Sequence, residues 1–215
     1  MDRHANRGIR TGYVRSEAAH FRRGGSEAGV ESNTRLTGAT AAVLLVLLAA
    51  EGLTLVSVRS LLGWHVFIGT LLVPPILVKI GSTGWRFVRY YRGAAAYRDK
   101  GPPPLLLRLL GPVVVILTVV LFASGISLVL APQSLRHTLR SAHTASFVLW
   151  FGAMTIHVVG HVVETARVAP LDWARRTRRD VAGAGARQWA LATSLIVGAA
   201  LGIAMLGPTT HYRHF

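Results

Sequence analysis

Residues 105–130 have the sequence LLLRLLGPVVVILTVVLFASGISLVL, in which Arg108 is the only charged residue. Crossing the hydrocarbon core of a bilayer as an α-helix takes about 20 consecutive, mostly apolar residues. Inside a bilayer only a helix or a closed barrel satisfies all of the backbone hydrogen-bonding groups. This stretch therefore predicts a transmembrane helix.

Four further apolar runs lie at about residues 36–58, 61–81, 142–167 and 189–206. The chain of 215 residues is 51% hydrophobic and 15% charged, with a mean hydropathy of +0.42, which is too apolar for an ordinary soluble domain. We therefore expect an all-α, polytopic membrane helix bundle with five transmembrane helices over residues 36–206. Gly198 and Gly202 give the last run a small-residue face for close contact with another helix.

The two ends of the chain are polar. Residues 1–35 carry seven arginines together with Gly and Ser, and we expect a disordered basic N-terminal tail there. Residues 207–215 are expected to form a short C-terminal tail. The chain has no cysteine, which excludes disulfides, iron–sulfur clusters and covalently attached c-type haem.

The positive charges are unevenly distributed between the segments that connect the apolar runs. Nineteen Lys and Arg residues lie in the tail, in residues 82–108 and in residues 167–187. The other side carries four, at Arg59, Arg136, Arg140 and Arg213. Because cytoplasmic loops are enriched in Lys and Arg, we expect a multi-pass protein of the cell membrane with a cytoplasmic N-terminus and an outer C-terminus. No nucleic-acid partner is expected, since the charge does not gather on one soluble face.

Ionisable side chains inside the second and fourth runs point to function, because such groups are costly at membrane depth. They are His65, Lys79, His143, His157 and His161. The first two are 14 residues apart, as are His143 and His157, which corresponds to about four helical turns and a rise of roughly 21 Å. The predicted topology makes these two helices parallel, so His65 lies level with His143 near the outer side and Lys79 level with His157 near the inner side.

Two histidines that face each other from neighbouring helices supply both axial ligands of a haem iron. In these runs the chain resembles the respiratory-type b cytochromes, including the cytochrome b561-like membrane subunits. That family binds two haems through two histidines, separated by thirteen residues, on each of two parallel helices. The stretch from His143 to His157 matches this pattern, and the second run matches at His65 but departs at Lys79. The resemblance implies an outer haem b ligated by His65 and His143.

Three alternative hypotheses apply to the ligands of the inner site. Lys79 acts as an unusual deprotonated ligand opposite His157, or His161 replaces His157, or the inner haem is absent; the cofactor prediction is thus one or two haems b. Lys79 could instead extend toward the headgroups or pair with a haem propionate. Small residues make room for a flat macrocycle, and Gly160 lies between the two histidines of the fourth run, as Gly63 and Gly69 flank His65.

Two carboxylates have candidate roles. Glu51 is roughly level with His65 and could orient that imidazole through its second nitrogen, or could simply face water. His157, His161 and Glu164 follow i, i+4, i+7 spacing, so they share one helical face and could form part of a zinc or iron site. The alternative interpretation is that Glu164 binds no metal and lies at the membrane boundary.

Together these features predict an integral membrane b-type cytochrome-like electron-transfer protein with haem between the second and fourth helices. It would be an electron-transfer subunit rather than a complete enzyme. The expected partners are the lipid bilayer and a redox partner subunit, with quinone as a further candidate. The alternative is a non-redox membrane protein, either a metal- or proton-handling transporter or a structural subunit.

Overall fold

The computed structural model describes residues 5–99, 101 and 105–209, with side chains from Glu27 onward. Every regular element in this part of the chain is a helix. In order they are α1 Ala5–Thr54, η1 Leu55–Ser57, α2 Val58–Tyr91, α3 Ala95–Asp99, α4 Leu105–Leu130, α5 Gln133–Val168, η2 Ala169–Asp172 and α6 Ala184–Thr209. The predicted all-α class is confirmed, and α4 has the bounds expected from its sequence.

Four helical stretches are long and apolar enough to cross a membrane: Glu27–Tyr91, Leu105–Leu130, Gln133–Asp172 and Ala184–Thr209. Between 11% and 22% of each apolar window is buried by protein. Most of these apolar side chains are therefore free to contact lipid, which is typical of a membrane protein.

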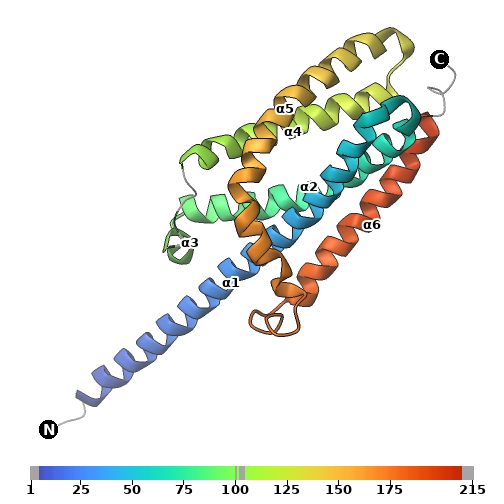
Figure 1. The fold of residues 1–215 in the computed structure, drawn as a ribbon. Coiled ribbons are helices and arrows are strands. Elements are labelled where there is room, and N and C mark those ends of the chain that lie inside the picture. The colour runs from blue at the N-terminus through green and yellow to red at the C-terminus, as the bar shows by residue number, and fades with distance from the viewer. Residues whose placement is uncertain (1–4, 100, 102–104, 210–215) are drawn as a thin grey trace.

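The first of these stretches holds two helices that lie side by side, α1 and α2 (Figure 1). The short 3-10 helix η1 joins them, and Ser57 leaves the helical region with φ −149° and ψ 70°. The hydroxyl of Ser60 donates to the backbone oxygen of Ser57 at 3.2 Å and lies 2.7 Å from its side-chain oxygen. These bonds satisfy polar groups that the break in the helix exposes.

The structure differs from the predicted disordered tail over residues 1–35. Helix α1 runs without interruption from Ala5 to Thr54, and Val30, Thr34 and Arg35 are buried. Arg35 contacts Thr177 and Asp172, which are distant in sequence, so no local apolar pattern could have predicted its burial. At the other end α6 continues to Thr209, past the predicted boundary at residue 207. Residues 1–4 and 210–215 lie outside the described residues.

The predicted small-residue face on α6 is confirmed, because α6 packs closely on α2 there. A Cβ atom on Gly198 would overlap the backbone oxygen of Leu71. A Cβ atom on Gly202 would lie 2.7 Å from the ring of Phe67 and 2.9 Å from its backbone oxygen. Only glycine lets the two backbones approach this closely.

The bundle has two halves, one made of α1, α2 and α6 and the other of the α4–α5 hairpin (Figure 1). Within the hairpin, the indole nitrogen of Trp150 donates to the hydroxyl of Thr118 at 2.9 Å. The halves meet closely near η2, where a Cβ atom on Gly38 of α1 would lie 2.7 Å from the side chain of Val168. We refer to this end of the bundle as the η2 end and to the opposite end as the η1 end.

A buried ion pair fastens the halves at the η2 end. Arg187 donates to both carboxylate oxygens of Asp172, at 2.5 Å from Nε and 2.7 Å from Nη2, and to the hydroxyl of Ser32 at 2.9 Å. Arg35 lies 3.6 Å from the same carboxylate and donates to the backbone oxygen of Thr177 at 2.8 Å. Asp172 and Arg187 are 2% and 7% exposed. This Asp172 cluster ties together α1, η2, the loop after it and α6.

We predict that Gly198→Ala lowers the free energy of unfolding by about 1–3 kcal/mol, because the new methyl group meets the backbone of α2. Gly152→Ala is the matched control, since nothing lies within 4 Å of a Cβ atom there, and Ala is the better helix former. Thermal unfolding of the two variants in detergent measures the difference. Equal midpoints would show that α6 does not pack on α2 in this way.

We also predict that Asp172→Ala lowers the free energy of unfolding by about 3–5 kcal/mol, because it leaves the Arg187 charge buried without its partner. Asp180→Ala removes an exposed carboxylate of the same loop and should leave the unfolding midpoint unchanged. If Asp172→Ala lowers the unfolding midpoint no more than Asp180→Ala does, the Asp172 cluster does not hold the two halves together.

Candidate functional site

His65 of α2 and His143 of α5 face each other across the two halves of the bundle. Their ring centroids are 6.4 Å apart and their planes are at 76°. Two imidazoles bound to one metal ion, each at about 2 Å from nitrogen to metal, have ring centres roughly 6.3 Å apart. The separation of the two ring centroids is therefore close to that of two imidazoles bound to one metal ion.

The Nδ1 atom of His65 lies against the last turn of α1. It is 2.8 Å from Oε1 of Glu51 and 2.9 Å from the hydroxyl oxygen of Thr54. Thr54 gives its own proton to the backbone oxygen of Glu51 at 2.6 Å, so its oxygen accepts from the imidazole. With the proton on Nδ1, the Nε2 atom of His65 presents a lone pair to a metal. The structure thus places Glu51 against His65, as the orienting interpretation requires.

The Nδ1 atom of His143 is engaged in the same manner, by α4. It lies 3.1 Å from the hydroxyl of Ser124 and 3.2 Å from the backbone oxygen of Leu121. A Cβ atom on Gly125 would lie 3.0 Å from Cε1 of His143, so the ring rests directly on the backbone of α4. Both rings therefore have Nδ1 close to oxygen acceptors, which is the usual condition of a metal-ligating histidine.

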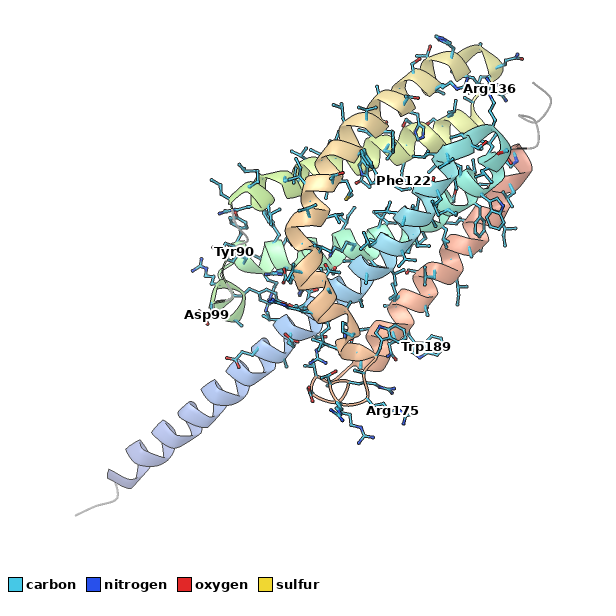
Figure 2. The ribbon with its side chains drawn as sticks, viewed as in Figure 1. Tyr90, Asp99, Phe122, Arg136, Arg175 and Trp189 are labelled. Atoms are coloured by element: carbon cyan, nitrogen blue, oxygen red, sulfur yellow. The ribbon has the colours of Figure 1, made fainter. Side chains whose placement is uncertain are left out.

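A cavity of about 1500 Å³ lies between the halves and contains both histidines in its wall. Small-molecule pockets are usually about 300–1,000 Å³, so this cavity has room for a large flat ligand. Gly63 and Gly69 also line it, and a Cβ atom on Gly69 would lie 3.4 Å from Oε1 of Glu51. Much of the remaining wall is apolar, and Figure 2 shows Phe122 of α4, one of the lining residues, between the two halves.

The predicted inner group has a different arrangement. The ammonium of Lys79 points to α1 and donates to the backbone oxygen of Thr37 at 3.0 Å. The ring of His157 lies against that of His161 on its own helix, with centroids 4.8 Å apart and planes at 56°, and its Nδ1 atom is buried without a hydrogen-bond partner. His161 lies 3.8 Å from a carboxylate oxygen of Glu164. Neither Lys79 nor the two histidines belong to the wall of the 1500 Å³ cavity.

Space for a cofactor at the inner group is also reduced. A Cβ atom on Gly160 would lie 2.6 Å from the side chain of Leu107. Gly160 therefore lets α4 pack on α5 and does not leave room for a macrocycle, contrary to our expectation. Among the described residues no group of three or more His, Cys, Asp or Glu is placed to hold a metal ion, so the face with His157, His161 and Glu164 does not form one.

The sequence reasoning missed Thr54, Ser124 and Gly125. The signal for the last two was the Ser-Gly pair inside the apolar run 105–130, since a hydroxyl next to a glycine in such a run indicates a polar group packing from a neighbouring helix. For Thr54 the signal was its position three residues after Glu51, one turn further along α1. Neither pattern predicts which residue is contacted, because the contacted residues lie on other helices.

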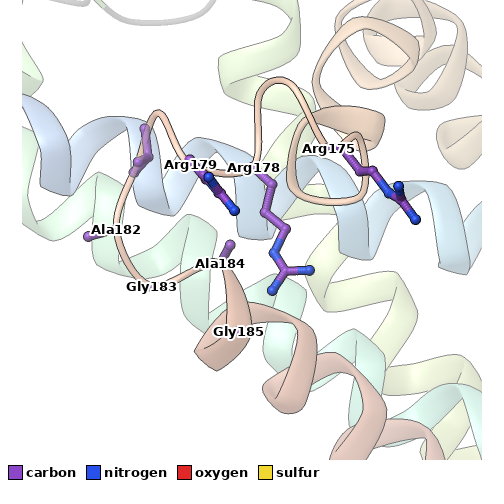
Figure 3. Close-up of a pocket in the computed structure, with 8 residues that line it drawn as sticks. Arg175, Arg178, Arg179, Ala182, Gly183, Ala184 and Gly185 are labelled. Carbon is purple, nitrogen blue, oxygen red and sulfur yellow. The ribbon is translucent and has the colours of Figure 1, made fainter.

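A second hollow of about 620 Å³ lies at the η2 end, where Gly183 turns the chain with φ +84° into the start of α6. Arg175, Arg178 and Arg179 line it and are all exposed. Figure 3 shows that Arg175 points away from the other two. The three guanidinium groups therefore do not converge on a common ligand, and they belong to the basic segment expected on the cytoplasmic side.

Comparisons of the chain with protein-family models, with curated proteins and with solved structures found no match. Any assignment of function therefore depends on the geometry of the site.

Proposed function

We propose that this chain is an integral membrane b-type cytochrome that holds one haem b between His65 of α2 and His143 of α5. The observation that carries the proposal is the pairing of these two rings. Their centroids are 6.4 Å apart, each Nδ1 atom is bound to oxygen, and both rings line one large cavity. Such a pair matches the axial ligand set of cytochromes that bind haem through two histidines, which the resemblance to the b561-like subunits had implied.

The transmembrane arrangement that goes with this function has five crossings. Helices α1 and α2 each cross once and reverse at η1, followed by α4, α5 and α6. The N-terminus is cytoplasmic, because the η2 end carries the basic segments. Exposed tryptophans support this boundary: Trp173 and Trp189 are 60% and 71% exposed near η2, and tryptophan favours the membrane–water interface. Figure 2 shows Arg175 and Trp189 at one end and Arg136 at the other.

The chain's own groups prepare the site for a metal-bound macrocycle. His65 and His143 would hold it, while Glu51, Thr54 and Ser124 would keep each imidazole in the tautomer that carries its lone pair on Nε2. Much of the wall is apolar, and an apolar environment tunes the reduction potential of a haem. When bound, haem supplies one-electron redox chemistry. The electrons come from and go to a partner subunit or quinone.

One haem is proposed rather than two, because the two candidate sites differ in the space they offer. The outer pair borders the 1500 Å³ cavity. At the inner group Lys79 binds Thr37, and Leu107 occupies the space beside Gly160. Lys79 thus acts as a bond between α1 and α2 and not as an axial ligand.

The alternative, a non-redox proton- or metal-handling protein, is supported by the inner group of Lys79, His157 and His161. The buried Nδ1 atom of His157 has no hydrogen-bond partner, and a single polar group of this kind is typical of a site along a pathway. Protein that is colourless when purified from haem-replete cells would favour this alternative over the cytochrome.

We predict that His65→Ala and His143→Ala each remove the haem absorption bands, because either change leaves the iron with one axial ligand in an apolar cavity. His157→Ala and Lys79→Ala should retain the bands at full intensity. Reduced-minus-oxidised spectra and haem content per chain measure both effects, with one haem per chain in the unchanged protein. A full spectrum in either outer variant, or two haems per chain, contradicts this assignment.

We predict that Glu51→Ala weakens haem binding by about 10–100-fold, as changes to groups behind a metal ligand commonly do. Glu51→Gln should bind haem more tightly than Glu51→Ala, because its amide oxygen still accepts from Nδ1 of His65. The reduction potential of the Glu51→Gln variant should exceed that of the unchanged protein, since the negative charge next to His65 has been removed. Glu164→Gln, at an exposed carboxylate, is the control. Equal behaviour of the Glu51 and Glu164 variants argues against the orienting role of Glu51.

A further inference from the structure

The wall of the 1500 Å³ cavity differs in exposure from one helix to the next. Val66 and Leu72 of α2 line the cavity and are 9% and 1% exposed. Phe151 and Val159 of α5 line it as well, but they are 58% and 69% exposed. A side chain that lines a cavity and is also largely exposed lies at the edge of that cavity. The cavity therefore has an open edge along α5.

Exposed wall residues form a stripe on each of two helices, at i, i+4, i+7 spacing on α1 and i, i+4, i+8 spacing on α5, so that each stripe follows one helix face. The residues are Leu45, Ala49 and Gly52 on α1 and Phe151, Thr155 and Val159 on α5. Helices α1 and α5 cross near the η2 end, where Gly38 packs on Val168, and they separate toward the η1 end (Figure 1). The two stripes therefore border an opening in the side of the bundle, which we call the α1–α5 window.

The edges of the α1–α5 window are free of charged side chains. The hydroxyl of Thr155 donates to the backbone oxygen of Phe151 at 2.8 Å, so its polar group is satisfied within α5. Nothing lies within 4 Å of a Cβ atom built on Gly52, so the α1 edge is unobstructed there. Toward the η1 end, by contrast, the cavity wall carries the charged side chains of Arg59 and Arg140. A largely apolar ligand in the bilayer therefore meets apolar surroundings at the window.

We propose that the α1–α5 window admits haem to the cavity from the bilayer, and that the aqueous phase at the η1 end is not the route. This inference rests on the proposed function and adds to it the path by which the cofactor reaches His65 and His143. A group that narrows the window raises the barrier to uptake and to release alike. Both rates therefore fall by the same factor, while the affinity, which is their ratio, stays the same.

The chain has no cysteine, so a single introduced cysteine carries a bulky thiol reagent to a chosen position. Ala49→Cys places the label in the window. Val46→Cys, one turn earlier on α1, is the matched control, because Val46 is 70% exposed but lies outside the cavity wall. Gln133→Cys, in the cavity wall at the first residue of α5, places the label at the η1 end and tests the aqueous route.

The first measurement is the rate at which labelled, full-length protein, purified in detergent from haem-deficient cells, takes up haem b. The labelled Ala49→Cys variant should take up haem more slowly than its unlabelled form by about tenfold or more, because the label adds a steric barrier. The labelled Val46→Cys and Gln133→Cys variants should take up haem at their unlabelled rates.

The second measurement labels protein purified with its haem in place and follows transfer of haem to an excess of apo-myoglobin. The labelled Ala49→Cys variant should keep its two-histidine spectrum and release haem more slowly by the same factor as in uptake. Slower uptake without slower release means that the label weakens the site itself, and it overturns this inference. Equal rates in the labelled Ala49→Cys and Val46→Cys variants, or slowing only in Gln133→Cys, also overturn it while leaving the proposed function in place. Absence of haem binding by the unchanged protein overturns both.

Discussion

The buried contact between Asp172 and Arg187 is the constraint on which the rest of the arrangement depends. It joins η2, which continues α5, to α6, and through Ser32 and Arg35 it also holds α1. Because Gly198 and Gly202 let α6 lie on the backbone of α2, the position of α2 follows from the position of α6. The two halves are therefore fastened at the η2 end, and the cavity with His65 and His143 lies between them.

The hydrogen bonds of polar side chains within the apolar helices explain why the two predicted sites differ in arrangement. Each outer histidine has an oxygen partner for Nδ1, from α1 for His65 and from α4 for His143, so burying the ring does not leave a donor unsatisfied. At the inner group Lys79 binds a backbone oxygen of α1, and His157 leaves a nitrogen without a hydrogen bond. The outer pair borders a large cavity, in whose wall Oε2 of Glu51 is buried without a hydrogen bond, whereas the inner group mainly joins neighbouring helices.

The limits of sequence-based prediction are clear at particular residues. The bounds of α4 and the contact face at Gly198 and Gly202 follow from composition and spacing, because a bilayer imposes helical structure and close packing demands small residues. The helical region before residue 36 could not be predicted in this way. Arg35 is buried through bonds to Thr177 and Asp172, more than 130 residues later in the chain, and no local periodicity records such a partner.

By itself, the sequence determined that the chain is helical and apolar, which residues are ionisable within its apolar runs, and that two pairs of them, His65 with Lys79 and His143 with His157, are each 14 residues apart. These properties depend on composition and on helical geometry, which are local. Only the tertiary structure decided that His65 and His143 meet at 6.4 Å, while Lys79 turns to α1 and Leu107 fills the space beside Gly160. Equal spacing places side chains at equal depth, but rotation of each helix and the side chains of its neighbours determine which of them face each other.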